Sequence, residues 1–507
     1  MSKKWLTVGL AAASAMTIFL SSCSPKGDDV SGSKTDSSSA GGQGISAEVV
    51  GKDPNADYTV SGEVVVAIDT ARPTDYEALF DTISSVYKNV DIKFDYFAHS
   101  STDTAEEYLT TRAAAGTLPD IIFDEAGKMP MYISQGWVYP LDEFVKDDPD
   151  FEYLPKNLVE EYTFGGKLYA LPHQAHYSMV LLNLDAFDAL NLDVPDLDWT
   201  IEDFTGLLKK ATNNTYSGVE RLWGFDEAAS IMFGNGGFFG YDKKTQQFSM
   251  MDSYAKSTTL QRQLRESPGV EAWYMRTSNA NLEESDYVKK FGKGNLDDLD
   301  MAFHMGRTAM GLYGTWDEFP LQQQNLSFQW TLWPYPQSAD HPGRMPLHVD
   351  HCFMTSSAKN PETAFQILRY ITYSTEGNIA RLSMFDETNK DKYVLNGKLY
   401  YPISTHPDIA KKFSELPSVG EVEQYLFDNI GNSSRADLWK FVPNFREIDS
   451  EYIEETTNRI GDGLYAAADV MPGVERNANA AMKKAWSDFD SKLEQVQQEF
   501  DAQHNYE

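Results

Sequence analysis

Four polar side chains follow apolar runs of strand length, where a ligand would meet them. Thr70 and Arg72 come after Val-Val-Val-Ala-Ile, and Asp124 and Glu125 come after Ile-Ile-Phe. Ligands of parallel α/β sheets bind beyond the carboxyl ends of the strands. An Arg there can donate paired hydrogen bonds to hydroxyls or to a carboxylate of a ligand. The alternative, that Arg72 is a solvated surface residue with no role in binding, has equal weight. Two adjacent carboxylates cannot both point at one glycosidic bond, which argues against a glycosidase.

Three further candidates lie close together at His173, His176 and Tyr177. A neutral imidazole can donate a hydrogen bond to one hydroxyl and accept one from another, which suits a polar ligand. The His-x-x-His spacing, or alternatively His348-Val-Asp350-His351, also raises the question of metal ligation. Neither pattern forms a complete ligand set, and the chain has only nine His, so no metal is predicted.

Aromatic side chains offer a second kind of contact, because flat rings stack on the apolar faces of sugars. Aromatic residues make up 13% of the chain, and Trp316 follows the turn Met-Gly-Leu-Tyr-Gly. Trp223 and Asn235 are further candidates, the latter within Gly-Asn-Gly-Gly, where backbone can approach a ligand. Burial in the core is the alternative for Trp316, and a plain turn for Asn235. No Gly-Lys-Ser/Thr follows these glycines, so a phosphate-binding loop is not predicted.

The elements that must position these residues alternate between strand and helix. The run at 64–68 has strand length, apolar residues recur at helical spacing over 74–87, and residues 90–96 alternate like a strand. Such a βαβ unit implies a parallel sheet covered by helices. The predicted fold class is therefore α/β.

The amino-terminal residues have the pattern of an export signal, with Lys3 and Lys4 before an apolar stretch. That stretch is shorter than the ~20 residues of a spanning helix, and an uncleaved anchor is the alternative. It ends in Leu-Ser-Ser-Cys23, which resembles the lipobox of bacterial lipoproteins. The resemblance implies that residues 1–22 are removed and that Cys23 carries diacylglycerol. Residues 23–59 are predicted to be largely a disordered Gly/Ser tether.

The length and charge of the chain limit its possible partners and its domain organisation. The chain has 507 residues and a formal net charge of −33. Nucleic acid is excluded as a partner, because binding phosphates requires clustered Lys and Arg. The length indicates two or more lobes. With Cys23 assigned to the lipid, Cys352 is the only other thiol, so no intramolecular disulfide is expected.

Several short blocks follow one another along the chain. They are Ala-Gly-Thr-Leu-Pro-Asp-Ile-Ile-Phe at 115–123, Gln-Gly-Trp-Val-Tyr-Pro-Leu-Asp-Glu-Phe at 135–144, Gly-Lys-Leu-Tyr-Ala-Leu-Pro at 166–172, Leu-Asn-Leu-Asp-Ala-Phe at 182–187, Trp-Thr-Ile-Glu-Asp-Phe at 199–204, Gly-Arg-Thr-Ala-Met at 306–310 and Ser-Ser-Ala-Lys-Asn-Pro-Glu-Thr-Ala-Phe at 356–365. In this order the blocks resemble family 1 extracellular solute-binding proteins, the maltose-binding-protein-like sugar receptors of ABC importers. The family commonly has Lys where Leu184 stands, and the resemblance covers about residues 60–375.

The resemblance implies a periplasmic-binding-protein-like fold, in which two α/β lobes are joined by several chain crossings and close over a ligand by a hinge motion. The first crossing is expected near 170–178. The expected amino-terminal lobe combines 60–172 with about 346–375, and the carboxy-terminal lobe combines 173–345 with about 376–507.

The resemblance also implies roles for the candidate residues. The loops after the strands line the cleft, the histidines lie at the first crossing, and Trp316 stacks on the ligand. The expected ligand-binding residues are Trp316, Asp124, Glu125, Arg72, Thr70, His173, His176, Tyr177, Trp223 and Asn235. The protein is expected to be a monomer without cofactor or metal, lipid-anchored at the extracellular face of the cell membrane, that captures a carbohydrate and delivers it to permease subunits.

Two other functions are open. One is a surface lipoprotein enzyme acting on polysaccharide, for which the 76 acidic residues could supply catalytic carboxylates. No hydrolase motif supports this function. The same fold with a peptide, a polyamine or another solute would use aromatic and acidic groups to hold a cation. Residues 376–470 match no family pattern, whereas a final helix should dock on a lobe by one apolar face. Its apolar positions are Met482, Trp486, Phe489, Leu493, Val496 and Phe500.

Overall fold

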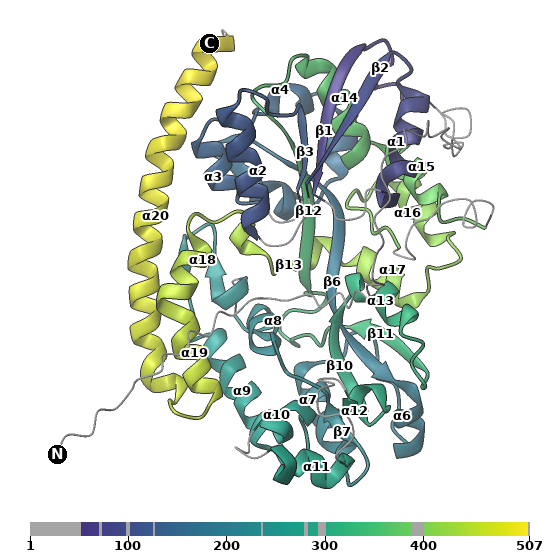
Figure 1. Ribbon diagram of the computed structural model, residues 1–507, viewed down its shortest axis with the longest axis vertical. Coiled ribbons are helices and arrows are strands. Elements are labelled where there is room, and N and C mark those ends of the chain that lie inside the picture. Colours follow the sequence, from purple (N-terminus) through teal and green to yellow (C-terminus); the bar gives the residue numbers. More distant parts are fainter. Residues whose placement is uncertain are drawn as a thin grey trace, which may run out of the picture. The chain divides into compact units, whose positions relative to one another are not determined.

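A mixed sheet pairs segments that lie far apart in the sequence. The computed structural model describes residues 52–69, 74–97, 102–124, 127–234, 237–277, 282–292, 301–387 and 399–504. The strands of the large sheet are β1 (Gly62–Asp69), β2 (Val90–Phe97), β3 (Ile121–Asp124), β6 (Leu171–Asn183), β7 (Ser217–Val219), β10 (Thr308–Gly314), β11 (Trp330–Pro334), β12 (Pro346–Met354) and β13 (Ser434–Arg435). Within the described ranges the main path through this sheet is β2, β1, β3, β12, β6, β10 and β7 (Figure 1).

The amino-terminal βαβ unit forms as predicted. β1 pairs in parallel with β2, and α1 (Thr74–Val86) connects the two strands. β3 pairs in parallel with the other edge of β1 and follows α2 (Thr102–Ala114). Val66 and Ala67 point to opposite faces of β1, yet both are buried. The continuous apolar run in the sequence therefore reflects a parallel strand that is covered on both faces.

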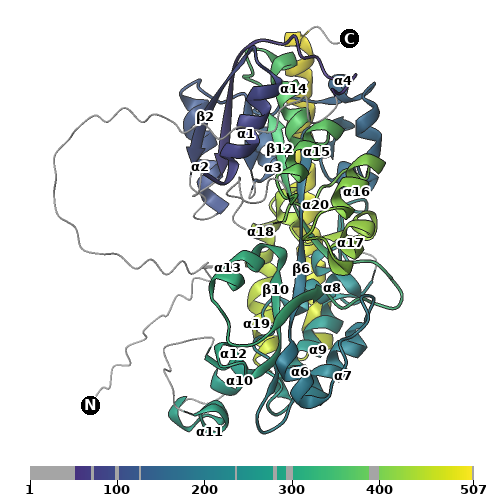
Figure 2. The same cartoon turned by 90° about the vertical axis from the view of Figure 1, so that its right-hand side faces the viewer.

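One long strand, β6, passes from this group of strands to a second group. Residues 171–177 of β6 pair antiparallel with β12, which in turn pairs antiparallel with β3. The remainder of β6 pairs with β10 and β11, and β7 lies parallel to β10. Figures 1 and 2 show β6 running between the two sets of elements. We call β1, β2, β3 and β12 the first group, and β7, β10 and β11 the second group.

Helices flank both groups. Up to β10 they are α3 (Met129–Ser134), α4 (Asp142–Val145), α5 (Lys156–Glu161), α6 (Leu184–Leu190), α7 (Ile201–Ala211), α8 (Phe225–Met232), α9 (Tyr254–Glu266), α10 (Ala272–Thr277), α11 (Asp286–Phe291) and α12 (Met301–His304). After β10 they are α13 (Glu318–Gln323), α14 (Pro361–Thr372), α15 (Thr375–Ser383), α16 (Pro407–Ser414), α17 (Glu421–Asp428), α18 (Phe445–Ile448), α19 (Glu454–Gly461) and α20 (Ala467–His504).

Short elements complete the chain. Two small hairpins are formed by β4 (Thr163–Phe164) with β5 (Lys167–Leu168) and by β8 (Tyr241–Asp242) with β9 (Gln247–Phe248). The short helical turns are η1 (Pro149–Tyr153), η2 (Phe238–Gly240), η3 (Leu282–Glu284), η4 (Thr315–Asp317), η5 (Ile430–Asn432), η6 (Leu438–Lys440) and the π-helical η7 (Asp449–Ile453).

The start of α14 shows how local sequence fixes an element. Asn360 caps this helix, since its side-chain oxygen accepts a hydrogen bond from the backbone N–H of Thr363 at 3.3 Å. Pro361 occupies the first turn, where its missing N–H costs nothing. Ile367 and Leu368 are buried on the inner side of the helix. The residue types at 360 and 361 thus explain where α14 begins.

The final helix, α20, packs by the apolar face that the sequence predicts. Trp486 in this face also donates its indole N–H to the Tyr241 hydroxyl at 2.6 Å. α20 contacts both α9 and α3, so it lies along elements of both groups (Figure 1). The buried positions are Met482, Trp486, Phe489, Leu493 and Phe500, and Val496 is partly buried.

The segment after α14 also contacts the first group. α15 packs against α14 and α1. The preceding helix holds the buried Arg369, whose guanidinium pairs with three carboxylates, those of Asp53, Asp148 and Asp150. This cluster ties the start of the described chain to the helices. The lobe boundaries given above stay a prediction.

Candidate functional site

The register of the sheet brings the carboxyl ends of β3 and β10 to one stretch of β6. Asp124, the last residue of β3, pairs with His351, and His351 pairs with Pro172 of β6. Gly314, the last residue of β10, pairs with Ser178 of β6. Residues 173–177 therefore lie between the carboxyl ends of strands from the two groups. Ligands of α/β sheets bind at such positions.

His176 is held in place at this stretch. Its Nε2 lies 3.0 Å from an oxygen of Asp350, and its Nδ1 lies 3.5 Å from the Thr315 hydroxyl. A carboxylate can only accept, so Nε2–H donates to it. Burial opposes ionisation of Asp350, but the nearby His176 and Lys440 outweigh it, so the pKa of this carboxyl lies well below its usual range. The ionised Asp350 thus fixes the orientation of the imidazole.

His348 faces His176 across the antiparallel pair of β6 and β12. Its Nε2 lies 3.4 Å from the Ser178 hydroxyl. Burial is the main cause that lowers the pKa of His348 to about 4. The ring is therefore neutral at pH 7 and can both donate and accept hydrogen bonds.

Trp316 joins the two histidines. Its ring centroid is 4.9 Å from that of His348 and 6.3 Å from that of His176, and the side chain is partly buried. Gly314 lies beneath the indole, because a Cβ on this glycine would come within 2.4 Å of the ring atoms. The residue at this position must therefore lack a Cβ for the indole to pack against the backbone. We call His176, His348 and Trp316 the histidine–tryptophan cluster.

Tyr177 lies on the opposite face of β6 from His176, because successive side chains of a strand alternate, whereas His173 lies where the register between β6 and β12 shifts. His173 is 1% exposed, and Tyr177 is 0% exposed. Nδ1 of His173 lies 3.2 Å from the guanidinium of Arg381, and burial together with Arg381 holds the pKa of His173 well below its usual range. The Tyr177 hydroxyl donates to the Leu426 carbonyl at 3.0 Å. In this structure both side chains attach β6 to neighbouring segments.

Trp223 stands apart from the cluster and is 58% exposed. It follows β7, whose carboxyl end lies at the same edge of the sheet as that of the parallel strand β10. Its ring lies 5.9 Å from that of Trp273, and the Arg221 guanidinium lies 4.8 Å above it. Such a cation–π contact orders an exposed indole.

The other candidates are not placed. Thr70, Arg72, Glu125, Asn235 and Cys23, the predicted lipidation site, lie outside the described residues. Asp124 ends β3, but the description does not extend to its side chain. Their assignment to the site stays a prediction.

The sequence analysis missed the residues that support the cluster from the segment 434–441. Asp437 accepts hydrogen bonds from the backbone N–H of Val349 at 3.1 Å and from the Arg435 guanidinium at 2.7 Å. Lys440 donates to the Val349 carbonyl at 3.2 Å and lies 3.7 Å from Asp350. Burial opposes ionisation of Asp437, but Arg435 and Lys440 hold the pKa of this carboxyl well below its usual range. No local pattern links this segment to β12, so no sequence signal would have found it.

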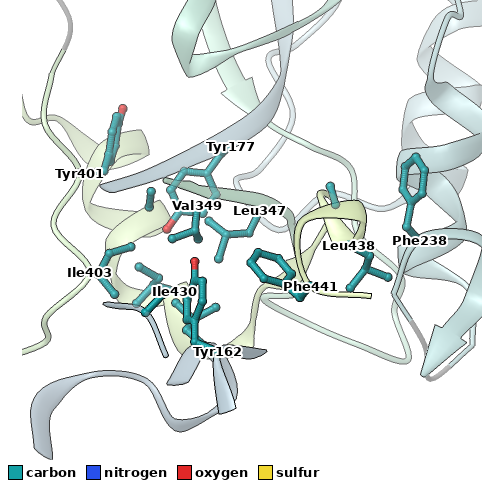
Figure 3. Close-up of a cluster of buried hydrophobic side chains, with 14 of the residues drawn as sticks. Tyr162, Tyr177, Phe238, Leu347, Val349, Tyr401, Ile403, Ile430, Leu438 and Phe441 are labelled. Atoms are coloured by element: carbon teal, nitrogen blue, oxygen red, sulfur yellow. The ribbon is translucent and has the colours of Figure 1, made fainter. Parts of the chain in front are cut away.

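Apolar side chains also pack around this segment. Figure 3 shows Leu347 and Val349 of β12 beside Tyr177 of β6, with Phe441 next to Leu347 and Leu438 farther along toward Phe238. All six are buried. The strands that carry the cluster are thus backed by a packed core.

In the described ranges, no three side chains among His, Cys, Asp and Glu come together as a metal site would require. A shallow hollow lies between α9 and the start of α20, and none of its lining residues belongs to the histidine–tryptophan cluster. No helix of the described chain has the length and apolarity needed to cross a membrane.

Several solved structures have a similar fold. An ABC substrate-binding protein from Listeria monocytogenes, solved in complex with cycloalternan, is 16% identical with a TM-score of 0.59 and aligns 84% of this chain with 100% of its own. The cyclic alpha-maltosyl-1,6-maltose binding protein from Arthrobacter globiformis is 15% identical with a TM-score of 0.61, over 84% of this chain and 100% of that one. A sugar transporter from Rhizobium etli, in an open conformation, is 17% identical with a TM-score of 0.60, over 83% and 100%.

At these identities the likeness shows the fold, and it confirms the periplasmic-binding-protein-like α/β class that the sequence predicted. The sequence itself matches a known family over residues 77–389, which is more than half of the chain. That family is described as bacterial extracellular solute-binding protein. The resemblance noted from the ordered blocks is thereby confirmed, and the chain belongs to the bacterial extracellular solute-binding proteins.

Proposed function

We propose that this protein is the carbohydrate receptor of an ABC importer, which binds an oligosaccharide outside the cell membrane and presents it to permease subunits. The observation that carries the proposal is the partly exposed indole of Trp316 between two histidines, where the carboxyl ends of both strand groups meet. An indole can stack on the apolar face of a sugar. The neutral His348 can exchange hydrogen bonds with its hydroxyls. Three proteins of similar fold are named for or solved with sugars or sugar transport.

The arrangement favours binding over hydrolysis. Thr315, His176 and Asp350 superficially resemble a nucleophile, a base and an orienting acid. The Thr315 hydroxyl, however, is buried and accepts a hydrogen bond from the backbone N–H of Tyr177 at 3.2 Å. This hydroxyl therefore supports the turn after β10 and lacks the access that a nucleophile needs.

Calorimetric titration of the exported chain tests the proposal. The Cys23→Ser form, which no longer carries a lipid, would be titrated with neutral oligosaccharides, a short peptide and a polyamine. We expect heat of binding with at least one saccharide and none with the other solutes. Binding of the peptide or polyamine alone would establish the same fold with a non-sugar solute. Release of reducing ends from a bound saccharide would establish the enzyme instead.

The membrane anchor belongs to the same proposal. It is supported by the apolar stretch that ends in Leu-Ser-Ser-Cys23. Because only a thiol accepts the diacylglycerol, Cys23→Ser should abolish palmitate labelling and leave residues 1–22 attached. Undiminished labelling of the Cys23→Ser protein would refute the anchor, but it would leave the binding function untouched. A closing motion of two lobes about β6, with the boundaries given in the sequence analysis, completes the proposed mechanism.

A further inference from the structure

The segment 434–441 does more than support the histidine–tryptophan cluster. Leu438, Lys440 and Phe441 are all buried, whereas Trp439 between them is only partly buried. The core side chains and the hydrogen bonds of Lys440 and Asp437 to Val349 fix this short turn against β12. The indole is therefore carried by an ordered piece of backbone, although its ring surface is not fully covered.

Trp439 lies next to the histidine–tryptophan cluster. Its ring centroid is 6.5 Å from that of His348, whose ring is 4.9 Å from that of Trp316. Because both indoles contact the same imidazole, their centroids are no more than about 11.4 Å apart. Two partly exposed indoles thus flank one neutral histidine.

Two further contacts hold the Trp439 indole in its orientation. The guanidinium of Arg446 lies 4.7 Å from the ring centroid, and the ring of Phe238 lies 6.2 Å from it at 72°. A cation over one face and an aromatic edge restrict rotation of the indole. A ring that is ordered before the ligand arrives loses little conformational entropy on binding.

We propose that Trp439 is a second stacking surface of the same site and that it makes the site select saccharides of at least two linked sugar units. This inference rests on the proposed function, since it assumes that Trp316 receives a sugar ring. One unit stacks on Trp316, and the saccharide passes His348 so that its second or a later unit stacks on Trp439. A monosaccharide on Trp316 does not reach the second indole. Trp439 thereby sets the minimum length of a tightly bound ligand.

A chain-length series tests the inference. Homo-oligomers of glucose, xylose and galactose, each of one to four units, would be titrated into the wild type, and the series that binds would be used for the variants. We expect Trp439→Ala to weaken binding of the longer members by roughly 5- to 30-fold. Binding of the monosaccharide should change less than about 2-fold. Trp316→Ala should instead weaken binding of every member that binds.

A second variant separates stacking from packing. Trp439→Leu keeps apolar bulk beside Phe238 but lacks a flat ring, so it should show the same length-dependent loss even if the alanine variant folds poorly. Trp439→Tyr should restore most of the affinity. An equal loss for all lengths, or no loss for any, would overturn the inference while leaving the proposed function intact. Failure of the wild type to bind any saccharide would overturn both.

Discussion

Replacing Trp316 by alanine separates a binding role from a structural one. The indole covers Gly314 and meets the edge of His348, yet part of it stays exposed. Stacking on a sugar face should contribute about 1 to 3 kcal/mol from the apolar area that the ligand buries. Trp316→Ala should then weaken saccharide binding roughly 5- to 150-fold, since every 1.4 kcal/mol is a factor of ten.

The same change should cost only part of the stability of a core tryptophan. Truncation of a fully buried indole costs about 3 to 5 kcal/mol, and a partly exposed one loses fewer contacts. Titration calorimetry would measure affinity, and denaturant unfolding would measure stability. A loss of about 3 kcal/mol or more in stability, with unaltered affinity in the folded protein, would refute the stacking role.

Trp137 provides the matched control. It is also partly buried, but it follows α3, where its ring stacks on Tyr132 with the centroids 6.2 Å apart. Trp137→Ala should lower the free energy of unfolding and leave saccharide affinity within about 2-fold. An affinity loss as large as that of Trp316→Ala would mean that the assay reports general loosening of the fold.

Three further predictions follow from the described contacts. Gly314→Ala places a methyl group within 2.4 Å of the Trp316 ring. Displacement of the indole should then weaken saccharide binding at least several-fold, as measured by calorimetry. Wild-type affinity in this variant would show that the ring is not needed at this position. Arg369→Met leaves three buried carboxylates without their cation. Denaturant unfolding should then show that the free energy of unfolding falls by roughly 3 to 5 kcal/mol. A decrease below about 1 kcal/mol would contradict the pairing. Burial is the main cause that raises the pKa of Glu227 to about 8 and of Asp449 to about 7. In the unfolded chain these carboxyls ionise near pH 4, so near neutral pH the folded form binds more protons than the unfolded form. The melting temperature should therefore fall as pH rises from 7 to 8.5. Glu227→Gln should flatten that slope, and an unchanged slope would exclude this carboxyl as its origin.

The candidate site was predictable only in part. Trp316 and His176 were both chosen from the sequence, and the structure brings them together beside His348. His173 and Tyr177 were chosen with His176, but strand alternation turns Tyr177 toward the opposite face of β6, and His173 lies where the register with β12 shifts. The spacing of His176 and Tyr177 contained their relative orientation once residues 171–183 were known to form a strand. The register shift at His173 depends on the pairing with β12, which the local sequence does not show.

The sequence by itself determined the features that depend on neighbours along the chain. The period of apolar residues determined the βαβ unit and the buried face of α20, and Asn360 with Pro361 determined the start of α14. These signals are local because a helix repeats every few residues and a strand alternates every two.

The tertiary structure alone decided which distant residues share a site. His348 faces His176 because β12 pairs antiparallel with β6 in one register, and a shift of one residue would turn its imidazole to the other face. Trp439 reaches this place because Asp437 and Lys440 bond to the backbone of Val349. Such pairings are chosen by the packing of the whole core and the satisfaction of its buried charges, which no stretch of neighbouring residues encodes.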